Sequence, residues 1–175
     1  RLYSGEAASA KRIFMNIVLE LIHTDVMRDK LFTFIRANYQ NEDADMKRII
    51  VADLCRVFYG GFLQNQILTF FDQQFPEESE ESRSVIIQKL LLSIRTPAVQ
   101  PKILDFLERH YDAMSGPQKE LFYRTFLEML PECDALAVSL LDTVNSLLKK
   151  EPEAFADRLD ADMTALLEAD YRRKD

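Results

Sequence analysis

The apolar residues of this chain recur at helical spacing, which constrains its fold more than any other feature of the sequence. Between residues 7 and 23, six large apolar residues fall at positions i, i+1, i+4, i+5, i+8 and i+9: Ile13, Phe14, Ile17, Val18, Leu21 and Ile22. Residues with this spacing share one face of an α-helix. The segment 7–23 is therefore predicted to be an amphipathic helix that buries this face.

The same periodicity predicts eight further helices. Gly and Pro together number ten of the 175 residues, about half their usual share, so the chain lacks the turns that many short strands require. The predicted fold class is all-α with about nine helices. The further helices are expected near 25–40, 43–59, 62–75, 80–95, 100–111, 117–129, 132–149 and 152–170.

Several predicted helix boundaries rest on individual residues. Asp25 and the acidic run 41–45 are placed to cap or stabilise helix N-termini, and Gly60-Gly61 supplies the positive φ for a tight reversal. Pro101 requires a helix that starts near residue 100 or is kinked there, because proline lacks the amide hydrogen of an interior position. Ser115-Gly116-Pro117 predicts a stop followed by a proline in the first turn of the next helix.

The odd-numbered helices are expected to begin near 7, 43, 80 and 117, at spacings of 36, 37 and 37 residues. This interval indicates a repeat. When the starts are aligned, apolar residues occupy equivalent positions: Ile13 with Ile50 and Ile87, Ile17 with Leu54 and Leu91, Leu31 with Leu68, and Phe34 with Phe71. The fourth unit does not keep this pattern.

With this period, and with a turn such as the one at 91–99, the chain resembles the HEAT or armadillo-like α-solenoids. The resemblance implies a right-handed stack of antiparallel helix pairs in one domain, 1–175, with units at 7–41, 43–76, 80–114 and 117–150 and a terminal helix at 152–170. Similar right-handed helical superhelices, such as polymerase-tail-binding and vesicle-adaptor domains, are alternative interpretations of the same pattern. We expect the chain to be an intracellular fragment, cytoplasmic or nuclear, of a larger protein.

Charge and cysteine content limit the classes of partner. The formal net charge is −7, which as a whole repels nucleic acid and anionic lipid. Residues 1–75 carry nine basic and nine acidic side chains, so the negative excess lies in the remainder. No run of apolar residues is long enough to predict a membrane span. The two cysteines, Cys55 and Cys133, are too few for a disulfide framework and are expected to be buried thiols.

The sequence contains few combinations of residues that could catalyse a reaction or bind a metal ion. Glu20 and His23 have the i, i+3 spacing of a di-iron ligand pair, but the only other histidine, His110, has no matching carboxylate. Zinc ligands at short spacing are missing, and four glycines form no phosphate-binding loop. We therefore expect no metal, no cofactor and no enzymatic activity.

Two features suggest a binding surface. The stretch 58–75 is rich in aromatic residues, and its helix is expected to be central in the fold. One edge of it, formed by Tyr59, Phe62 and Phe70, could instead anchor a partner helix or peptide. A strip of basic residues in the N-terminal part includes further candidates, Arg28, Arg36 and Arg56, among Lys11, Arg12, Lys30, Lys47 and Arg48.

These features predict a non-enzymatic protein–protein interaction or scaffold module of a larger intracellular assembly, which presents a ridge of second helices to another protein. The alternative is a helical domain that contacts nucleic acid through the N-terminal basic strip. The oligomeric state is not predicted.

Overall fold

A computed structural model describes residues 3, 7–24, 27–94, 96–129, 137–158, 161 and 164, and in this part of the chain the regular structure is helical throughout, without strands. The predicted all-α class with about nine helices is thereby confirmed. Residues 153–158 are helical, and they follow eight α-helices: α1 (Ala8–Ile22), α2 (Arg28–Asn38), α3 (Ala44–Tyr59), α4 (Gln64–Gln74), α5 (Glu80–Ser93), α6 (Gln100–His110), α7 (Gly116–Met129) and α8 (Ala137–Leu148). The predicted cap Asp25, Cys133 and the predicted helix beyond 158 lie outside the described ranges, apart from residues 161 and 164.

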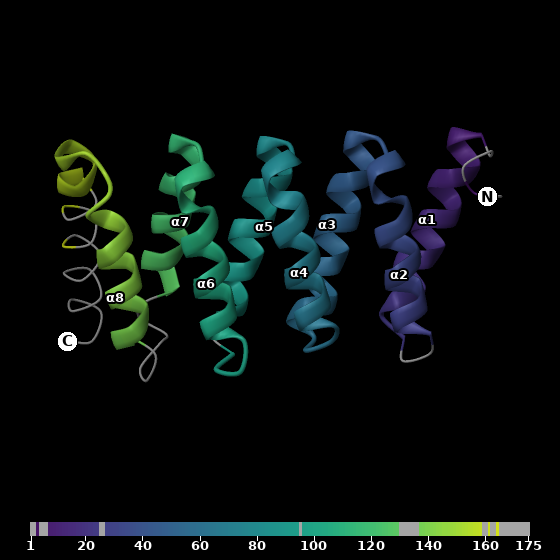
Figure 1. Cartoon of the computed structure of the whole chain (residues 1–175), viewed down its shortest axis with the longest axis horizontal. Helices are drawn as coiled ribbons and strands as arrows, with labels where there is room; N and C mark the ends of the chain where they lie inside the picture. The colour runs from purple at the N-terminus through teal and green to yellow at the C-terminus, as the bar shows by residue number, and fades with distance from the viewer. Residues whose placement is uncertain are drawn as a thin grey trace, which may run out of the picture. The chain divides into compact units, whose positions relative to one another are not determined.

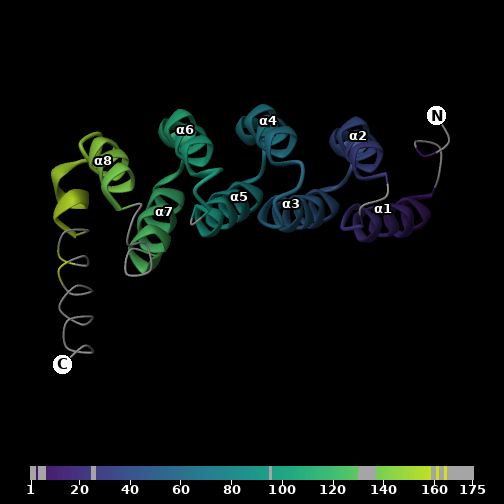
Figure 2. The same cartoon turned by 90° about the horizontal axis from the view of Figure 1, so that it is seen from below.

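The chain divides into two compact units, residues 1–86 and 87–175, with the boundary inside α5. In the first unit, α1 packs against α2 and α3, and α3 packs against α4. Within this unit, α1 and α3 lie in one layer and α2 and α4 in the other (Figures 1 and 2). In the second unit, α6 packs against α8, and α7 lies in the opposite layer (Figure 2).

The helices recur at an interval of 36 residues. The first helices of successive pairs begin at Ala8, Ala44, Glu80 and Gly116, and the second helices begin at Arg28, Gln64 and Gln100. A short 3-10 turn follows α2, α4 and α6, again 36 residues apart: η2 (Tyr39–Asn41), η3 (Phe75–Glu77) and η4 (Tyr111–Ala113). Each turn begins with a buried aromatic residue.

This interval corrects the predicted alignment of the repeats by one residue. The prediction grouped Ile13 with Ile50 and Ile87, yet Ile13 is 63% exposed whereas the other two are fully buried. At an interval of 36, the buried residues align instead: Val18, Leu54, Leu90 and Phe126. The sequence allowed both alignments because apolar residues stand in adjacent pairs, such as Ile50-Val51 and Ile86-Ile87.

Local signals fix several helix ends. Asp43 accepts a hydrogen bond from the backbone amide of Met46 at 2.8 Å and so caps α3, and Ser79 accepts one from the amide of Ser82 at 3.1 Å at the start of α5. Gly61 adopts the predicted positive φ, of 85°. α6 starts at Gln100 with a proline in its first turn, as the first of the two predicted alternatives required.

Aromatic packing stabilises each unit separately. In the first, Phe70 of α4 is 3% exposed and makes edge-on contacts with Phe32 and Tyr39, so this side of α4 lies in the core of the unit. In the second, Tyr111 and Tyr123 are buried, and their hydroxyl groups share a hydrogen bond of 2.7 Å. Both cores therefore depend on aromatic residues from the turns that end the helix pairs.

Candidate functional site

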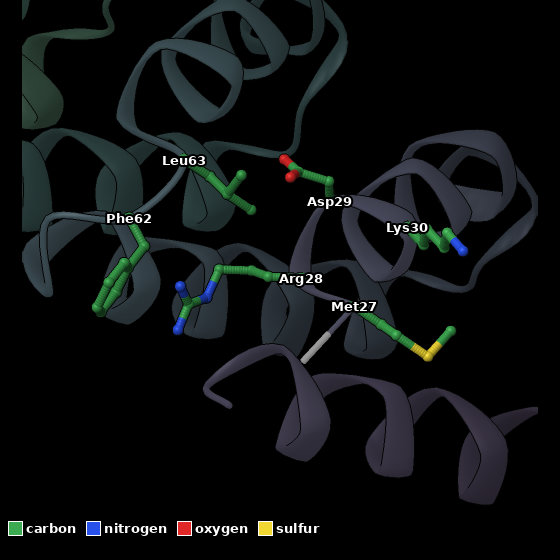
Figure 3. Close-up of a pocket in the computed structure, with 6 residues that line it drawn as sticks. All are labelled: Met27, Arg28, Asp29, Lys30, Phe62 and Leu63. Atoms are coloured by element: carbon green, nitrogen blue, oxygen red, sulfur yellow. The ribbon is translucent and has the colours of Figure 1, made fainter. Parts of the chain in front are cut away.

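The first unit has a surface pocket of about 290 Å³ where the N-terminus of α2 meets the turn between α3 and α4. We call the residues around it the turn surface; Figure 3 shows the six that line it: Met27, Arg28, Asp29, Lys30, Phe62 and Leu63. Tyr59, at the end of α3, is three residues before Phe62 and is included because it is 70% exposed.

Arg28 is held in place at the centre of the turn surface. Its guanidinium carbon lies 3.7 Å from the centroid of the Phe62 ring, which is a cation–π contact (Figure 3). Its Nε donates a hydrogen bond of 3.0 Å to the backbone oxygen of Ile22, at the end of α1. A cation at this end of a helix is favoured by the helix dipole. The contacts with Phe62 and Ile22 thus order the guanidinium plane.

The Phe62 ring packs closely against Gly60. A Cβ atom added to Gly60 would lie 3.3 Å from the ring, tighter than an ordinary contact, so the close approach depends on the absence of a side chain at position 60. The backbone amide of Phe62 also donates to the oxygen of Val57 at 3.2 Å. Even so, Phe62 remains 44% exposed. A large apolar side chain that is rigid and exposed is suited to contact a partner.

Two residues with positive φ line the pocket, and neither is glycine. Met27 (φ 67°) and Leu63 (φ 52°) each precede the first residue of a second helix, α2 and α4, and they are 36 residues apart. No side-chain hydrogen bond caps either helix at these positions. Each of these two residues turns the chain sharply into the helix that follows it. The strained left-handed backbone therefore has the same structural cause at both positions.

We expect Met27→Gly to raise the free energy of unfolding by about 1 kcal/mol, because glycine adopts this φ without the steric cost that a side chain incurs. The Met27 side chain is 56% exposed, so its loss removes little burial. Chemical denaturation of the wild type, Met27→Gly and the matched control Met27→Ala measures the effect. An alanine variant as stable as the glycine variant would contradict the strain at this position.

The turn surface contains three of the six predicted partner-binding residues: Arg28, Tyr59 and Phe62. Arg56 is exposed at the end of α3, and its Nη1 lies 2.7 Å from Oδ1 of Asp53. Arg36 is exposed in the last turn of α2 and does not line the pocket. The prediction that Phe70 contacts a partner is corrected, because this side chain is buried among aromatic rings and offers no surface to a partner.

The predicted basic strip is partly neutralised by acidic neighbours. Arg48 lies 3.5 Å from Asp45 and 3.8 Å from Glu81, in addition to the contact of Arg56 with Asp53. Around the pocket itself, Arg28 and Lys30 outnumber the single carboxylate of Asp29. The formal charge of the residues that line the pocket is therefore positive, although the chain as a whole is acidic.

The other residues considered as catalytic or metal-binding candidates do not line the pocket. Nε2 of His23 is 3.9 Å from Oδ1 of Asp53, while the His110 ring packs 4.6 Å from that of Phe106 in the second unit. Cys55 is buried. Across the residues with described positions, no group of three or more His, Cys, Asp or Glu side chains could hold a metal ion. None of the helices described is both long and apolar enough to cross a membrane.

Sequence reasoning missed Met27 and Leu63 as part of this surface. Neither residue type predicts a positive φ, since glycine or asparagine is usual there. Their separation of one repeat interval was the available signal, and it becomes visible only once the interval is known to be 36 residues.

Comparisons of the chain with protein-family models, with curated proteins and with solved structures found no match.

Proposed function

We propose that this chain is a non-enzymatic protein-interaction module, built of tandem helix pairs similar to HEAT repeats, and that it binds a segment of a partner protein at the turn surface. The observation that carries the proposal is a pocket lined by exposed side chains, in which Arg28 is stacked on Phe62 and Met27 lines the same pocket. Tyr59, three residues before Phe62, adds a further exposed aromatic side chain.

The residue types at the turn surface support binding to protein. Tyrosine and arginine are enriched among the residues that dominate interface energies. A phenylalanine and a methionine that are half exposed add apolar surface that a partner can cover. Since Arg28 and Phe62 already order one another, binding loses less side-chain entropy than it would with mobile groups.

The charge of the pocket suggests which segments it takes. Arg28 and Lys30 lie on the N-terminal turn of α2, where the helix dipole adds positive potential. A partner segment with an acidic residue next to an apolar one would pair its carboxylate with these cations and place its apolar side chain against Phe62.

Selection from a random peptide library on the intact chain tests this function. Peptides that bind the wild type but not a Tyr59→Ala/Phe62→Ala double variant should be enriched in acidic and apolar residues. Each substitution alone should weaken a selected peptide by about tenfold or more, because removing a dominant interface anchor commonly costs about 2 kcal/mol and 1.4 kcal/mol corresponds to tenfold. Affinities from fluorescence anisotropy give the measurement.

Gln66→Ala provides the control, because this residue is exposed on α4 and does not line the pocket. It should leave the affinity unchanged. If no enriched peptide depends on Tyr59 or Phe62, the turn surface is not the binding site.

Contact with nucleic acid through the basic strip stays a prediction without a specific observation in its favour. Titration with RNA or DNA at two salt concentrations separates it from the proposal. Nucleic-acid binding through this strip should weaken steeply as salt rises, because phosphate contacts release counterions. Absence of binding at low salt would eliminate it.

A further inference from the structure

Residues 149–158, which we call the end segment, add no fully buried residue to the core of the second unit. The end segment follows α8 as a turn and a helical stretch, and the last buried residue before it is Leu147. Segments with few buried apolar contacts are those that open locally while the rest of a protein stays folded. The attachment of the end segment therefore depends on a small number of side-chain contacts.

The corresponding segment of the first unit is anchored differently. Two repeat intervals earlier, residues 77–86 have three buried positions, and the equivalent positions of the end segment are all exposed. The equivalent residues are Glu78 and Lys150, Ser82 and Ala154, and Ile86 and Arg158. The end segment thus lacks the buried anchors that the same repeat positions have in the first unit.

A buried ion pair connects the end segment to α7. Nζ of Lys119 lies 2.7 Å from Oε1 of Glu151, and the two side chains are only 19% and 8% exposed. The ammonium group of Lys119 also lies over the Tyr111 ring, 4.7 Å from its centroid. Because water screens the pair only weakly, its two charges interact strongly, and removing one charge leaves the other buried without compensation.

The other contacts of the end segment are aromatic or lie at the surface. The Phe155 ring packs 5.6 Å from that of Tyr123, whose hydroxyl group shares the hydrogen bond with Tyr111. Lys150 lies 3.5 Å from Asp112, but both side chains are exposed, and an exposed pair contributes little stability. Among these described contacts, the pair of Lys119 with Glu151 is therefore the strongest polar attachment.

We infer that Lys119 and Glu151 form a latch, which holds the end segment against α7 and releases it when either charge is removed. α6, α7 and α8 stay folded in the open form, because they bury apolar residues of their own. Opening uncovers the Tyr123 ring, against which Phe155 packs in the closed form. The latch lies in the second unit and does not depend on the function proposed for the turn surface.

Hydrogen exchange of the intact chain, followed by mass spectrometry, tests the latch. In Lys119→Met, peptides from the end segment should exchange at least about tenfold faster than in the wild type, because Glu151 loses its counter-charge. Peptides from α6 and from the first unit should keep the wild-type rate. Equally accelerated exchange in α6 would overturn the inference, because the whole unit would then open together.

A double-mutant cycle tests whether the two residues act on each other. Glu151→Leu alone should also accelerate exchange of the end segment. The double variant Lys119→Met/Glu151→Leu places two apolar side chains at the latch, so its exchange should be slower than in Lys119→Met. If the effects of the two substitutions simply multiply, the residues act separately and the inference is wrong.

Lys150→Met is the matched control, because it removes a lysine next to the latch whose partner Asp112 is exposed. The end segment of this variant should exchange at the wild-type rate. An acceleration as large as that of Lys119→Met would also overturn the inference, since any change of charge in this region would then open the segment.

Discussion

Leu54→Asp is expected to unfold the first unit. Leu54 of α3 is fully buried, and an aspartate there would place an unpaired carboxylate among apolar side chains. The cost should be about 4 kcal/mol or more, close to the whole stability of a small domain. Far-UV circular dichroism and thermal melting of the purified variant measure the effect.

Ile17→Asp is the matched control, because it makes a comparable change at a position that the predicted alignment grouped with Leu54. Ile17 is 47% exposed, so the variant should fold and melt close to the wild type. Val18→Asp, one residue further on and aligned with Leu54 at the interval of 36, should fail to fold. A soluble Leu54→Asp variant that melts cooperatively would contradict the buried position of this side chain.

The second large effect is loss of stability at high pH. Burial, together with the hydrogen bond to Tyr123, raises the pKa of Tyr111 well above its usual value of 10.0. Burial raises the pKa of Tyr123 to about 12, and burial with the nearby Glu78 carboxylate raises the pKa of Tyr39 in the first unit. All three hydroxyl groups therefore favour the protonated form in the folded chain.

The sign of the pH effect follows from these directions. Above pH 10 the unfolded chain releases the tyrosine protons while the folded chain keeps them, so the unfolding free energy falls as pH rises. The stability is fully present below pH 10, and each buried tyrosine contributes a slope of up to about 1.4 kcal/mol per pH unit above it. We expect a cooperative alkaline transition, with tyrosinate absorbance and circular dichroism changing together.

A Tyr111→Phe/Tyr123→Phe double variant removes both hydroxyl groups of the pair and leaves neither one without a partner. Its alkaline transition should move to higher pH, whereas Tyr59→Phe, at an exposed position, should not change it. Tyrosinate absorbance that rises near pH 10 for all tyrosines, ahead of any unfolding, would contradict the burial of these groups.

The candidate site was predictable only in part. Arg28, Tyr59 and Phe62 were proposed as partner-binding residues from residue type and position, and the structure brings Arg28 and Phe62 together across 34 residues of sequence. The prediction that Phe70 is exposed was wrong, because helical spacing does not show which side is covered when a helix is apolar on two sides. Met27 could not be identified, since no local signal in the sequence predicts its left-handed backbone.

The sequence by itself determined the helical class and most helix limits, because helical periodicity, prolines and capping residues act within a few neighbouring residues. Asp43, Gly61 and Pro101 lie where their local chemistry requires. Only the tertiary structure decided which apolar face is buried and which residues meet across turns. α1 carries apolar residues around more than half of its circumference, and the choice between Ile17 and Val18 as the inward residue depends on where α3 packs.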